Sequence, residues 1–113
     1  MKRGEIWAVD FNPTIGAEIN KIRPAVIISD DNIGILPLKI IIPITDWKLE
    51  FTNYSWMTKI QPSKINNLSK NSCADSFQVK SLSINRFIHK IGKVTKEEIE
   101  EIVAGVGICV DFK

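Results

Sequence analysis

The sequence contains very little histidine and cysteine. Its 113 residues include one His and two Cys. Two cysteines are too few for a disulfide framework, and Cys73 and Cys109 lack CxxC spacing. A His/Cys metal site is not expected with a single histidine, and a Ser-His-Asp or Cys-His hydrolase would have only His89 to use. We therefore expect any chemistry to run without a metal or another cofactor.

Long apolar runs are also missing. No run reaches the ~18 residues that a membrane span needs, and the charged N-terminal residues are not followed by the apolar stretch of a secretory signal. We therefore expect a cytoplasmic protein without a membrane partner. With 44% apolar and 25% charged residues the composition is that of a globular protein, and the length predicts one domain over residues 1–113.

Positive and negative charges nearly balance over the whole chain, but they are unevenly distributed along it. The net charge is +2, yet residues 1–93 hold 13 of the 15 Lys and Arg residues. Residues 94–113 hold five acidic residues and two basic ones. A basic body suits an anionic partner such as a nucleic acid, although a plain solvated surface accounts for it equally well.

Short apolar or β-branched runs, separated by turn residues, predict a mainly β chain. The expected strands cover residues 5–9, 24–29, 38–44, 54–60, 77–82 and 87–94. Residues 11–23 are rich in turn residues and predict a loop. Pro43 predicts a bulge or a sheet edge near the end of its strand. Because no helix separates the strands, the pattern favours an antiparallel barrel or rolled sheet.

The C-terminal segment has the pattern of a helix. Thr95 and Glu98 have the spacing of a capping box. Apolar residues then follow at helical spacing, at Ile99, Ile102, Val103 and Val106. Gly105 and Gly107 leave the end of this helix open.

Arg23 and Thr45 border two of the expected strands. A guanidinium at the mouth of a sheet can bind a phosphate through two hydrogen bonds, and Lys21 adds charge nearby. The hydroxyl of Thr45 could position the same phosphate. If residues 24–29 pair with residues 38–44, the two side chains approach each other at one edge. The structural alternative is a surface arginine before a proline and an ordinary strand-end threonine.

Other reactive or aromatic side chains have simpler interpretations. Trp47 could be a stacking platform for an unpaired base, although a partly buried aromatic explains it too. We expect His89 to be an exposed strand residue. Cys73 and Cys109 have no basic sequence neighbour that would favour a thiolate, so we interpret both as structural.

Several motifs together resemble MazF/PemK-type toxins of type II toxin–antitoxin modules. The opening motifs are Lys-Arg-Gly-Glu-Ile-Trp at residues 2–7, the loop at residues 10–18, and Arg-Pro-Ala-Val-Ile-Ile-Ser at residues 23–29. Ile-Pro-Ile-Thr at residues 42–45 is similar to the second motif. Asn71-Ser72 with Gln78 resembles the third motif, usually written Asp-Ser followed by Gln. The resemblance extends over nearly the whole chain.

The resemblance implies a fold, an activity and partners. The fold would be an SH3-like small antiparallel β-barrel with a C-terminal helix, forming a homodimer. The activity would be sequence-specific, metal-independent endoribonuclease cleavage of single-stranded RNA. The 2′-OH of the substrate would be the nucleophile, and the products would carry 2′,3′-cyclic phosphate and 5′-hydroxyl ends. A cognate antitoxin protein would bind and inhibit the toxin.

The resemblance also implies roles for individual residues. Arg23 would stabilise the charged phosphorane, and Thr45 would hydrogen-bond the phosphate. The loop over residues 12–21 would gate the groove. The RNA-binding residues would be Asn12, Thr14, Glu18, Lys21, Trp47, Asn71, Ser72 and Gln78. The chain departs from the family at Ile19, where Gln is usual, and at Asn71, where Asp is usual, and both positions affect sequence preference.

Two other functions remain compatible with the sequence. Gyrase-inhibiting toxins share this fold and act by binding through their C-terminal end, without catalysis. A barrel that binds RNA and has lost cleavage is the other alternative. The presence of both Arg23 and Thr45 favours the nuclease.

Overall fold

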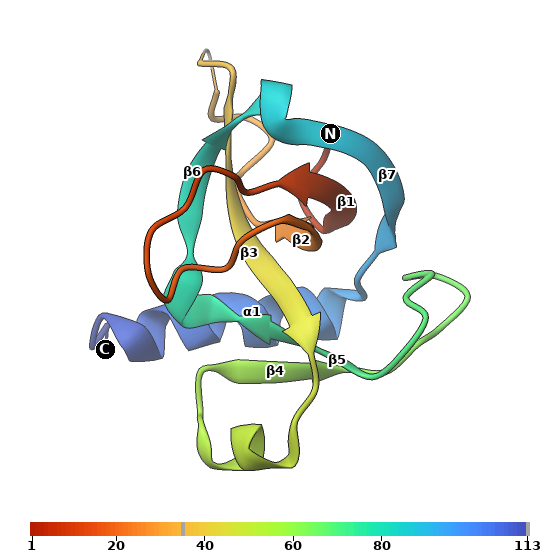
Figure 1. Ribbon diagram of the computed structural model, residues 1–113, viewed down its shortest axis with the longest axis vertical. Helices are drawn as coiled ribbons and strands as arrows, with labels where there is room; N and C mark the ends of the chain where they lie inside the picture. The colour runs from red at the N-terminus through yellow and green to blue at the C-terminus, as the bar shows by residue number, and fades with distance from the viewer. Residues whose placement is uncertain (35, 113) are drawn as a thin grey trace.

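The computed structural model describes residues 1–34 and 36–112, which form one antiparallel seven-stranded sheet and a C-terminal helix (Figure 1). The strands are β1 (Glu5–Asp10), β2 (Ile22–Ile27), β3 (Leu38–Asp46), β4 (Met57–Ile60), β5 (Ser72–Asp75), β6 (Lys80–Ser83) and β7 (Phe87–Lys93). Three short 3-10 turns are η1 (Leu49–Asn53), η2 (Ser76–Gln78) and η3 (Ile84–Arg86), and the helix is α1 (Lys96–Cys109). The mainly β architecture with one C-terminal helix confirms the predicted fold class.

The strand order is β4-β5-β3-β2-β1-β7, and β6 pairs with β3 beside this path. Along one edge, β3 therefore pairs with two strands in succession, with β6 at residues 38–41 and with β5 at residues 44–46. Pro43 falls between these two stretches and is fully buried. On that edge of β3, Pro43 faces neither partner strand, so its missing N–H leaves no ladder bond unmade. This agrees with the expected edge position near the end of the strand.

Several strand boundaries differ from those expected. β2 begins at Ile22, so Arg23 lies inside the strand and not in the preceding loop. β3 continues to Asp46 and includes Thr45. Residues 77–82 divide into η2 and β6, and the expected strand over 54–60 is shortened to β4. β5 was missed, because Ser-Cys-Ala-Asp is short and lacks a β-branched residue, although all four residues are buried.

The core consists of two clusters on opposite sides of β2. One lies between the sheet and α1 and contains Ile6, Val26, Ile42, Ile44, Ile60, Ala74, Val94, Ile99 and Ile102. The other contains Val9, Phe11, Ala25, Ile27 and Ile41. Because successive side chains of a strand point to opposite faces, both faces of β2 are buried, as its unbroken apolar run predicts.

The capping box at the start of α1 is confirmed. The Thr95 amide donates to Glu98 Oε1 at 2.8 Å, and the Glu98 amide donates to Thr95 Oγ1 at 3.1 Å. The helix continues through both glycines to Cys109. No helix within residues 1–34 and 36–112 has the length and apolarity to cross a membrane.

Candidate nucleic-acid interface

Arg23 and Thr45 lie side by side on β2 and β3. The antiparallel register pairs Ala25 with Pro43, so two residues further along it sets Arg23 opposite Thr45. Both side chains are half-buried and line the same cavity of about 170 Å³. Strand pairing therefore brings together two residues that are distant in the chain.

The guanidinium of Arg23 has donors to spare. Its Nε donates to the backbone oxygen of Asn20 at 3.2 Å, and within the described residues no acceptor pairs with its Nη1 or Nη2. Lys70 also lines the cavity and forms an ion pair with Asp46, Nζ to Oδ2 at 3.1 Å. Both partners of that pair are exposed, so it contributes little stability and leaves the ammonium accessible. The cavity therefore offers an anion the N–H groups of the Arg23 guanidinium and the accessible ammonium of Lys70.

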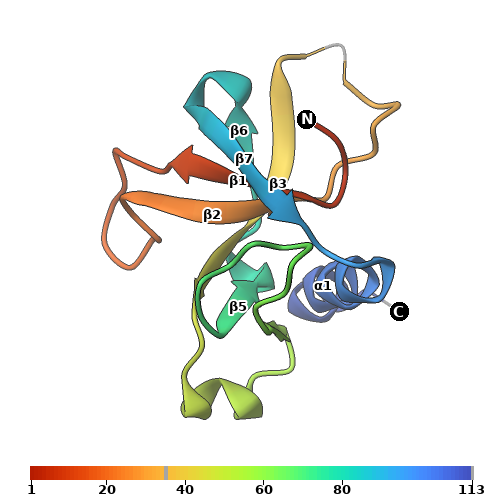
Figure 2. The ribbon, with the colours of Figure 1, turned by 90° about the vertical axis from the view of Figure 1, so that its right-hand side faces the viewer.

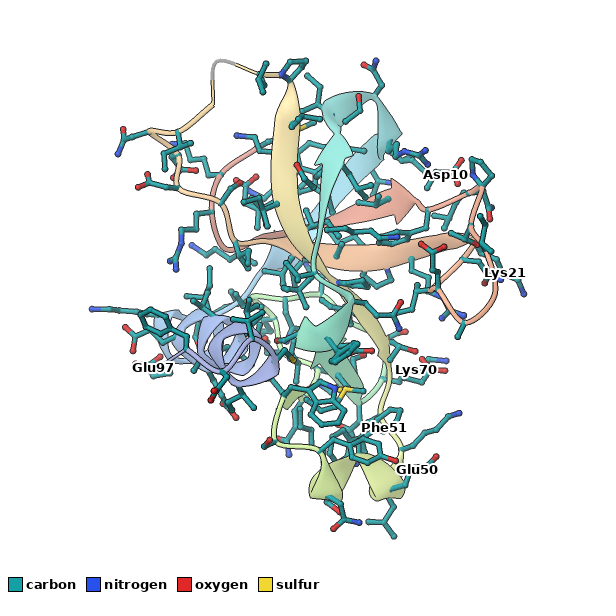
Figure 3. All side chains as sticks on the ribbon, turned by 90° about the vertical axis from the view of Figure 1, so that its left-hand side faces the viewer. Asp10, Lys21, Glu50, Phe51, Lys70 and Glu97 are labelled. Carbon is teal, nitrogen blue, oxygen red and sulfur yellow. The ribbon has the colours of Figure 1, made fainter. Side chains whose placement is uncertain are left out.

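Of three further candidate residues, Ser72 lines this cavity, whereas Asn71 and Trp47 are sequence neighbours of residues that line it. Ser72 lines it, is buried, and donates from Oγ to the backbone oxygen of Lys70 at 2.9 Å. The backbone oxygen of the exposed Asn71 accepts a hydrogen bond from the amide of Trp47 at 3.1 Å. Figure 3 shows Lys70 and Lys21 on the same side of the molecule, with Phe51 on the turn below Lys70.

Trp47 is a half-buried aromatic that contacts other side chains. Its ring meets Phe51 edge-on at 6.0 Å, and Lys59 Nζ lies 5.1 Å from the ring centre. Further ring contacts continue the row from Phe51 to Tyr54, then Trp56, then Phe77. Trp47 is thus partly buried by its neighbours, as the structural interpretation of this residue expects. It is also the first ring of this row of aromatic contacts, two residues after Thr45.

A second group of predicted residues lies where the loop between β1 and β2 docks on η2. The Ile19 amide donates to Gln78 Oε1 at 2.8 Å, and Glu18 forms an ion pair with Lys80 at 3.3 Å. A hydrogen bond from the Ile15 amide, and then Lys80, lower the pKa of Glu18. Glu18 and Gln78 line a hollow of about 370 Å³, distinct from the cavity of Arg23.

Asn12, Thr14 and Lys21 belong to the same loop and line neither hollow. Asn12 Oδ1 accepts from the Lys21 amide at 3.2 Å, which closes the base of the loop. In Figure 2 this loop projects on the opposite side of the molecule from α1. The structure therefore groups these three residues with Glu18 and not with Arg23 and Thr45.

Asp75 contacts the candidate residue Gln78, and the sequence reasoning did not single it out. Its side chain is only 7% exposed and accepts from the Phe77 amide and from Gln78 Nε2, both at 3.1 Å. A signal was present, because Asp75-Ser76 is an Asp-Ser pair only two residues before Gln78. Asp75 is the residue that contacts Gln78, and the assignment of Asn71-Ser72 to the family motif stays a prediction.

The two thiols and the histidine do not line the cavity of Arg23. Cys73 pairs with Thr45 across β3 and β5, and burial together with the charge of Asp75 raises its pKa to about 12. Burial also raises the pKa of Cys109. Both groups are therefore neutral thiols at neutral pH, and His89 is exposed on β7. Within the described residues, no three or more His, Cys, Asp or Glu side chains are arranged to hold a metal ion.

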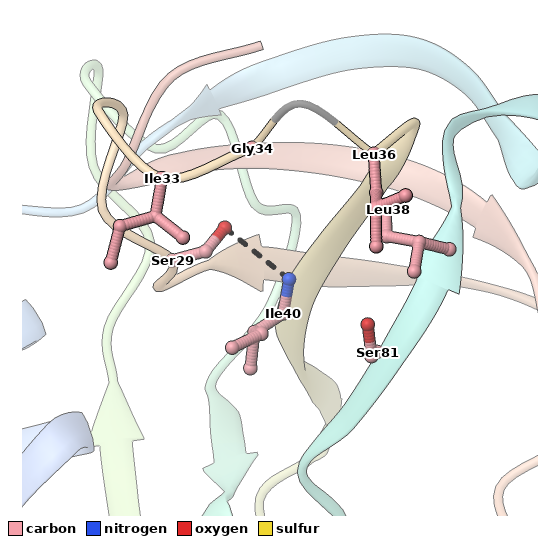
Figure 4. A pocket seen from close by; sticks show the side chains of 7 residues that line it. All are labelled: Ser29, Ile33, Gly34, Leu36, Leu38, Ile40 and Ser81. Atoms are coloured by element: carbon pink, nitrogen blue, oxygen red, sulfur yellow. Dashed lines mark hydrogen bonds between the residues drawn. The ribbon is translucent and has the colours of Figure 1, made fainter.

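A further hollow of about 370 Å³ is apolar (Figure 4). It lies between the β2–β3 connection, the start of β3 and β6, and exposed side chains line it at Ile33, Leu36, Leu38 and Ile40. It has no charged residue among the described side chains that line it and offers nothing to a phosphate.

Comparison with known proteins gives one consistent result. In sequence, the chain is 27% identical to the endoribonuclease MazF9 of Mycobacterium tuberculosis, covering 99% of this chain and 98% of that protein. It is 26% identical to the endoribonuclease MazF of Staphylococcus saprophyticus, covering 97% and 91% of the two chains.

Solved structures have the same fold. MazF of Deinococcus radiodurans superposes with a TM-score of 0.81 at 18% identity, over 98% of this chain and 96% of that one. A mycobacterial endoribonuclease in complex with its cognate antitoxin superposes with a TM-score of 0.77 at 13% identity, over 100% and 97% of the two chains. Residues 2–110 match the family described as PemK-like, MazF-like toxin of type II toxin-antitoxin system. The chain therefore belongs to the PemK/MazF family of toxins.

Proposed function

We propose that this toxin is a cytoplasmic, sequence-specific endoribonuclease that cleaves single-stranded RNA, with mRNA as its target, and needs no metal. The observation that carries the proposal is the shared cavity of Arg23 and Thr45, into which the guanidinium can direct unpaired donors. The two relatives described above are named endoribonucleases, which supports the same activity here. A gyrase-inhibiting toxin would not need these two side chains together.

The chemistry uses a nucleophile that belongs to the substrate. The ribose 2′-oxygen attacks the adjacent phosphorus and loses its proton, while the bond to the 5′-oxygen breaks and that oxygen gains a proton. The products are a 2′,3′-cyclic phosphate and a 5′-hydroxyl. Two Nη–H groups of Arg23 bind the non-bridging oxygens, where negative charge increases in the phosphorane. The role of Arg23 is electrostatic, because a guanidinium does not titrate near neutral pH.

Thr45 and the surrounding residues position the RNA. The hydroxyl of Thr45 donates to the same phosphate, and Ser72 lines the same cavity. Bases on either side reach polar groups that can read unpaired base edges, and Trp47 offers a ring on which one base stacks. We assign base contacts to Asn12, Thr14, Glu18, Lys21, Trp47, Asn71, Ser72 and Gln78.

Two protein partners complete the proposal. A flexible acidic segment of a cognate antitoxin lies across the basic cavity near Arg23 and excludes RNA. The toxin itself forms a homodimer, and the exposed apolar side chains around Leu36 and Ile40 are consistent with protein association. Saturating antitoxin should protect RNA, and excess RNA should compete with it; full cleavage by the saturated complex contradicts steric blocking. Sedimentation of the free toxin tests the dimer.

The cleavage mechanism is tested with Arg23→Ala and a matched control. In Arg3, as in Arg23, Nε donates to a backbone oxygen at 3.2 Å, but its acceptor is Ile28 at the opposite end of β2. We expect Arg23→Ala to lose about 10²–10³-fold in cleavage rate and Arg3→Ala to cleave normally. The rates are measured in EDTA on a long single-stranded RNA, and the new 5′ ends are mapped. Unimpaired cleavage by Arg23→Ala would falsify the mechanism. Growth arrest without RNA cleavage by the wild type would favour the gyrase alternative.

A further inference from the structure

The backbone oxygen that holds Arg23 belongs to a fixed segment of the β1–β2 loop. Arg23 Nε donates to Asn20 O at 3.2 Å. The residue before Asn20 is Ile19, and its amide donates to Gln78 Oε1 at 2.8 Å. One side of this two-residue segment therefore binds the guanidinium, while the other is bound by η2.

The amide of Gln78 can make these contacts in one orientation only. The Ile19 N–H can only donate, so it must face Oε1. The Asp75 carboxylate can only accept, so Nε2 must face Asp75 Oδ2, which lies 3.1 Å away. Asp75 is itself held, because its Oδ1 accepts from the Phe77 amide at 3.1 Å and the residue is buried. A continuous set of hydrogen bonds thus runs from Asp75 through Gln78 to Ile19.

Other contacts of the loop near Asn20 are weaker. In the ion pair of Glu18 with Lys80, the glutamate is exposed and the lysine is half-buried, and ion pairs with an exposed partner contribute little. Other backbone hydrogen bonds join Ile15 to Glu18 or lie at the base of the loop. The side chain of Ile19 also packs against the core cluster that contains Phe11. The bond between Gln78 and Ile19 is therefore a partly buried hydrogen bond at the residue next to Asn20, which orients Arg23.

We propose that Asp75 and Gln78 are positioning residues that set the direction of the Arg23 guanidinium through Ile19 and Asn20. This inference rests on the proposed function of the Arg23 cavity in RNA cleavage. Neither residue needs to touch the scissile phosphate. They act by reducing the number of directions in which Arg23 can present its Nη donors, and misplacement of a catalytic group by about 1 Å can cost about 10²-fold in rate.

The donor and acceptor pattern suggests a swap experiment. Gln78→Glu leaves an acceptor for Ile19 but sets a second carboxylate against Asp75. Asp75→Asn sets an amide donor against Gln78 Nε2, and flipping either amide only moves the conflict to Ile19 or Phe77. In the double variant Asp75→Asn/Gln78→Glu, the amide introduced at the first position donates to the carboxylate introduced at the second. Every hydrogen bond then has a donor and an acceptor again, and the swap conserves size and net charge.

The first measurement is the single-turnover cleavage rate at pH 8, where the introduced carboxyl group is ionised. We expect each single variant to lose about 10- to 100-fold and the double variant to recover to within a few-fold of the wild type. In an Arg23→Ala background, Gln78→Glu should cost much less than in the wild type, because its effect through Arg23 is gone and only its base contact remains. If Gln78→Glu does not fold, as judged by circular dichroism, Gln78→Ala replaces it in this cycle.

The second measurement needs no RNA. In ¹⁵N spectra of the free protein, the Nε–H signal of Arg23 should move and exchange faster with water in each single variant and return in the double variant. The Nε–H signal of Arg3 is the internal control and should stay in place. A merely structural role for Asp75 would change the unfolding midpoint without this paired response.

The two proposals fail in distinguishable ways. An unchanged Arg23 signal in both single variants would overturn the positioning role while wild-type cleavage remains intact. So would a loss from Gln78→Glu that is as large in the Arg23→Ala background as in the wild type. A double variant slower than both single variants would do the same. If the wild type does not cleave RNA, the proposed function fails, and the ¹⁵N spectra still decide whether Asp75 and Gln78 hold Arg23.

Discussion

The hydroxyl of Ser76 donates a hydrogen bond to the backbone oxygen of Ile102 over 2.8 Å, and this bond ties η2 to helix α1. Both residues are fully buried. A hydroxyl in such a place needs its partner, since an unpaired buried polar group costs about 1–3 kcal/mol. The turn that carries Gln78 is therefore anchored to the helix on one side and to the β1–β2 loop on the other.

We predict that Gly105→Ala destabilises the fold. A Cβ atom at this position would lie 2.7 Å from Ser76 Oγ and 3.0 Å from the backbone oxygen of Trp56. Such overpacking typically costs about 1–3 kcal/mol, more than the helix propensity gained over glycine. Urea unfolding measures the difference in free energy of unfolding.

Gly107→Ala is the matched control in the same helix. The nearest atom to its added Cβ is Phe112 Cβ at 3.7 Å, an ordinary contact. This variant should be neutral or more stable by up to about 1 kcal/mol. Equal effects of the two substitutions would contradict the close approach of α1 to η2.

We predict that Glu5 makes the fold sensitive to acid. Burial raises the pKa of Glu5, but hydrogen bonds from Trp7, the Lys2 amide and Lys90 outweigh it and lower the pKa to about 2. Because the folded pKa lies below the unfolded value near 4.5, the stabilisation is complete above about pH 4.5. It should be lost as the pH falls toward 2, by about 2–3 kcal/mol.

The comparison of wild type with Glu5→Gln isolates this effect. Urea unfolding at pH 7, 4.5, 3.5 and 2.5 should give a difference in free energy of unfolding that shrinks toward acid pH. A difference that stays constant over this range would show that the ionised carboxylate of Glu5 is not what stabilises the fold.

We predict that Cys73 is inert toward alkylation in the folded protein. The pKa of about 12 leaves almost no thiolate at pH 8, and the side chain is fully buried. Mass spectrometry after iodoacetamide treatment should find Cys73 unmodified in buffer and modified in urea. RNA cleavage should survive the treatment, since no thiol takes part in the proposed chemistry. Rapid labelling of Cys73 in the native protein would contradict the burial of this thiol.

We predict that Trp47 strengthens the binding of single-stranded RNA. In an Arg23→Ala background, where bound RNA stays intact, Trp47→Ala should weaken binding by about 1–3 kcal/mol if a base stacks on the ring. Fluorescence anisotropy of a labelled oligonucleotide measures the dissociation constant. Phe112→Ala removes an exposed aromatic near the C-terminus and serves as the control. Identical affinities for the two variants would leave Trp47 with packing against Phe51 and Lys59 alone.

Local sequence patterns were sufficient for the elements whose signal lies within a few residues. The capping box at Thr95 and Glu98 located the start of α1, because both hydrogen bonds connect residues three positions apart. The runs that became β1, β3 and β7 were recognised by their apolar content. Arg23 and Thr45 were identified as candidate residues by chemistry, motif and position.

Tertiary structure decided the features that depend on distant parts of the chain. β5 is a strand because β3 and β4 pair with it, and its four residues carry too little side-chain signal to predict this. Position 105 of the helix is a glycine where α1 approaches η2, and a Cβ there would lie 2.7 Å from Ser76 Oγ. Asp75 matters because folding sets it against Gln78 and sets Gln78 against Ile19, 59 residues away. The sequence by itself predicted Arg23 and Thr45 as candidates for the chemistry, because residue type and motif are local. Long-range packing determined that they share one cavity and that Asp75 contacts Gln78, because strand pairing and turn docking join distant segments.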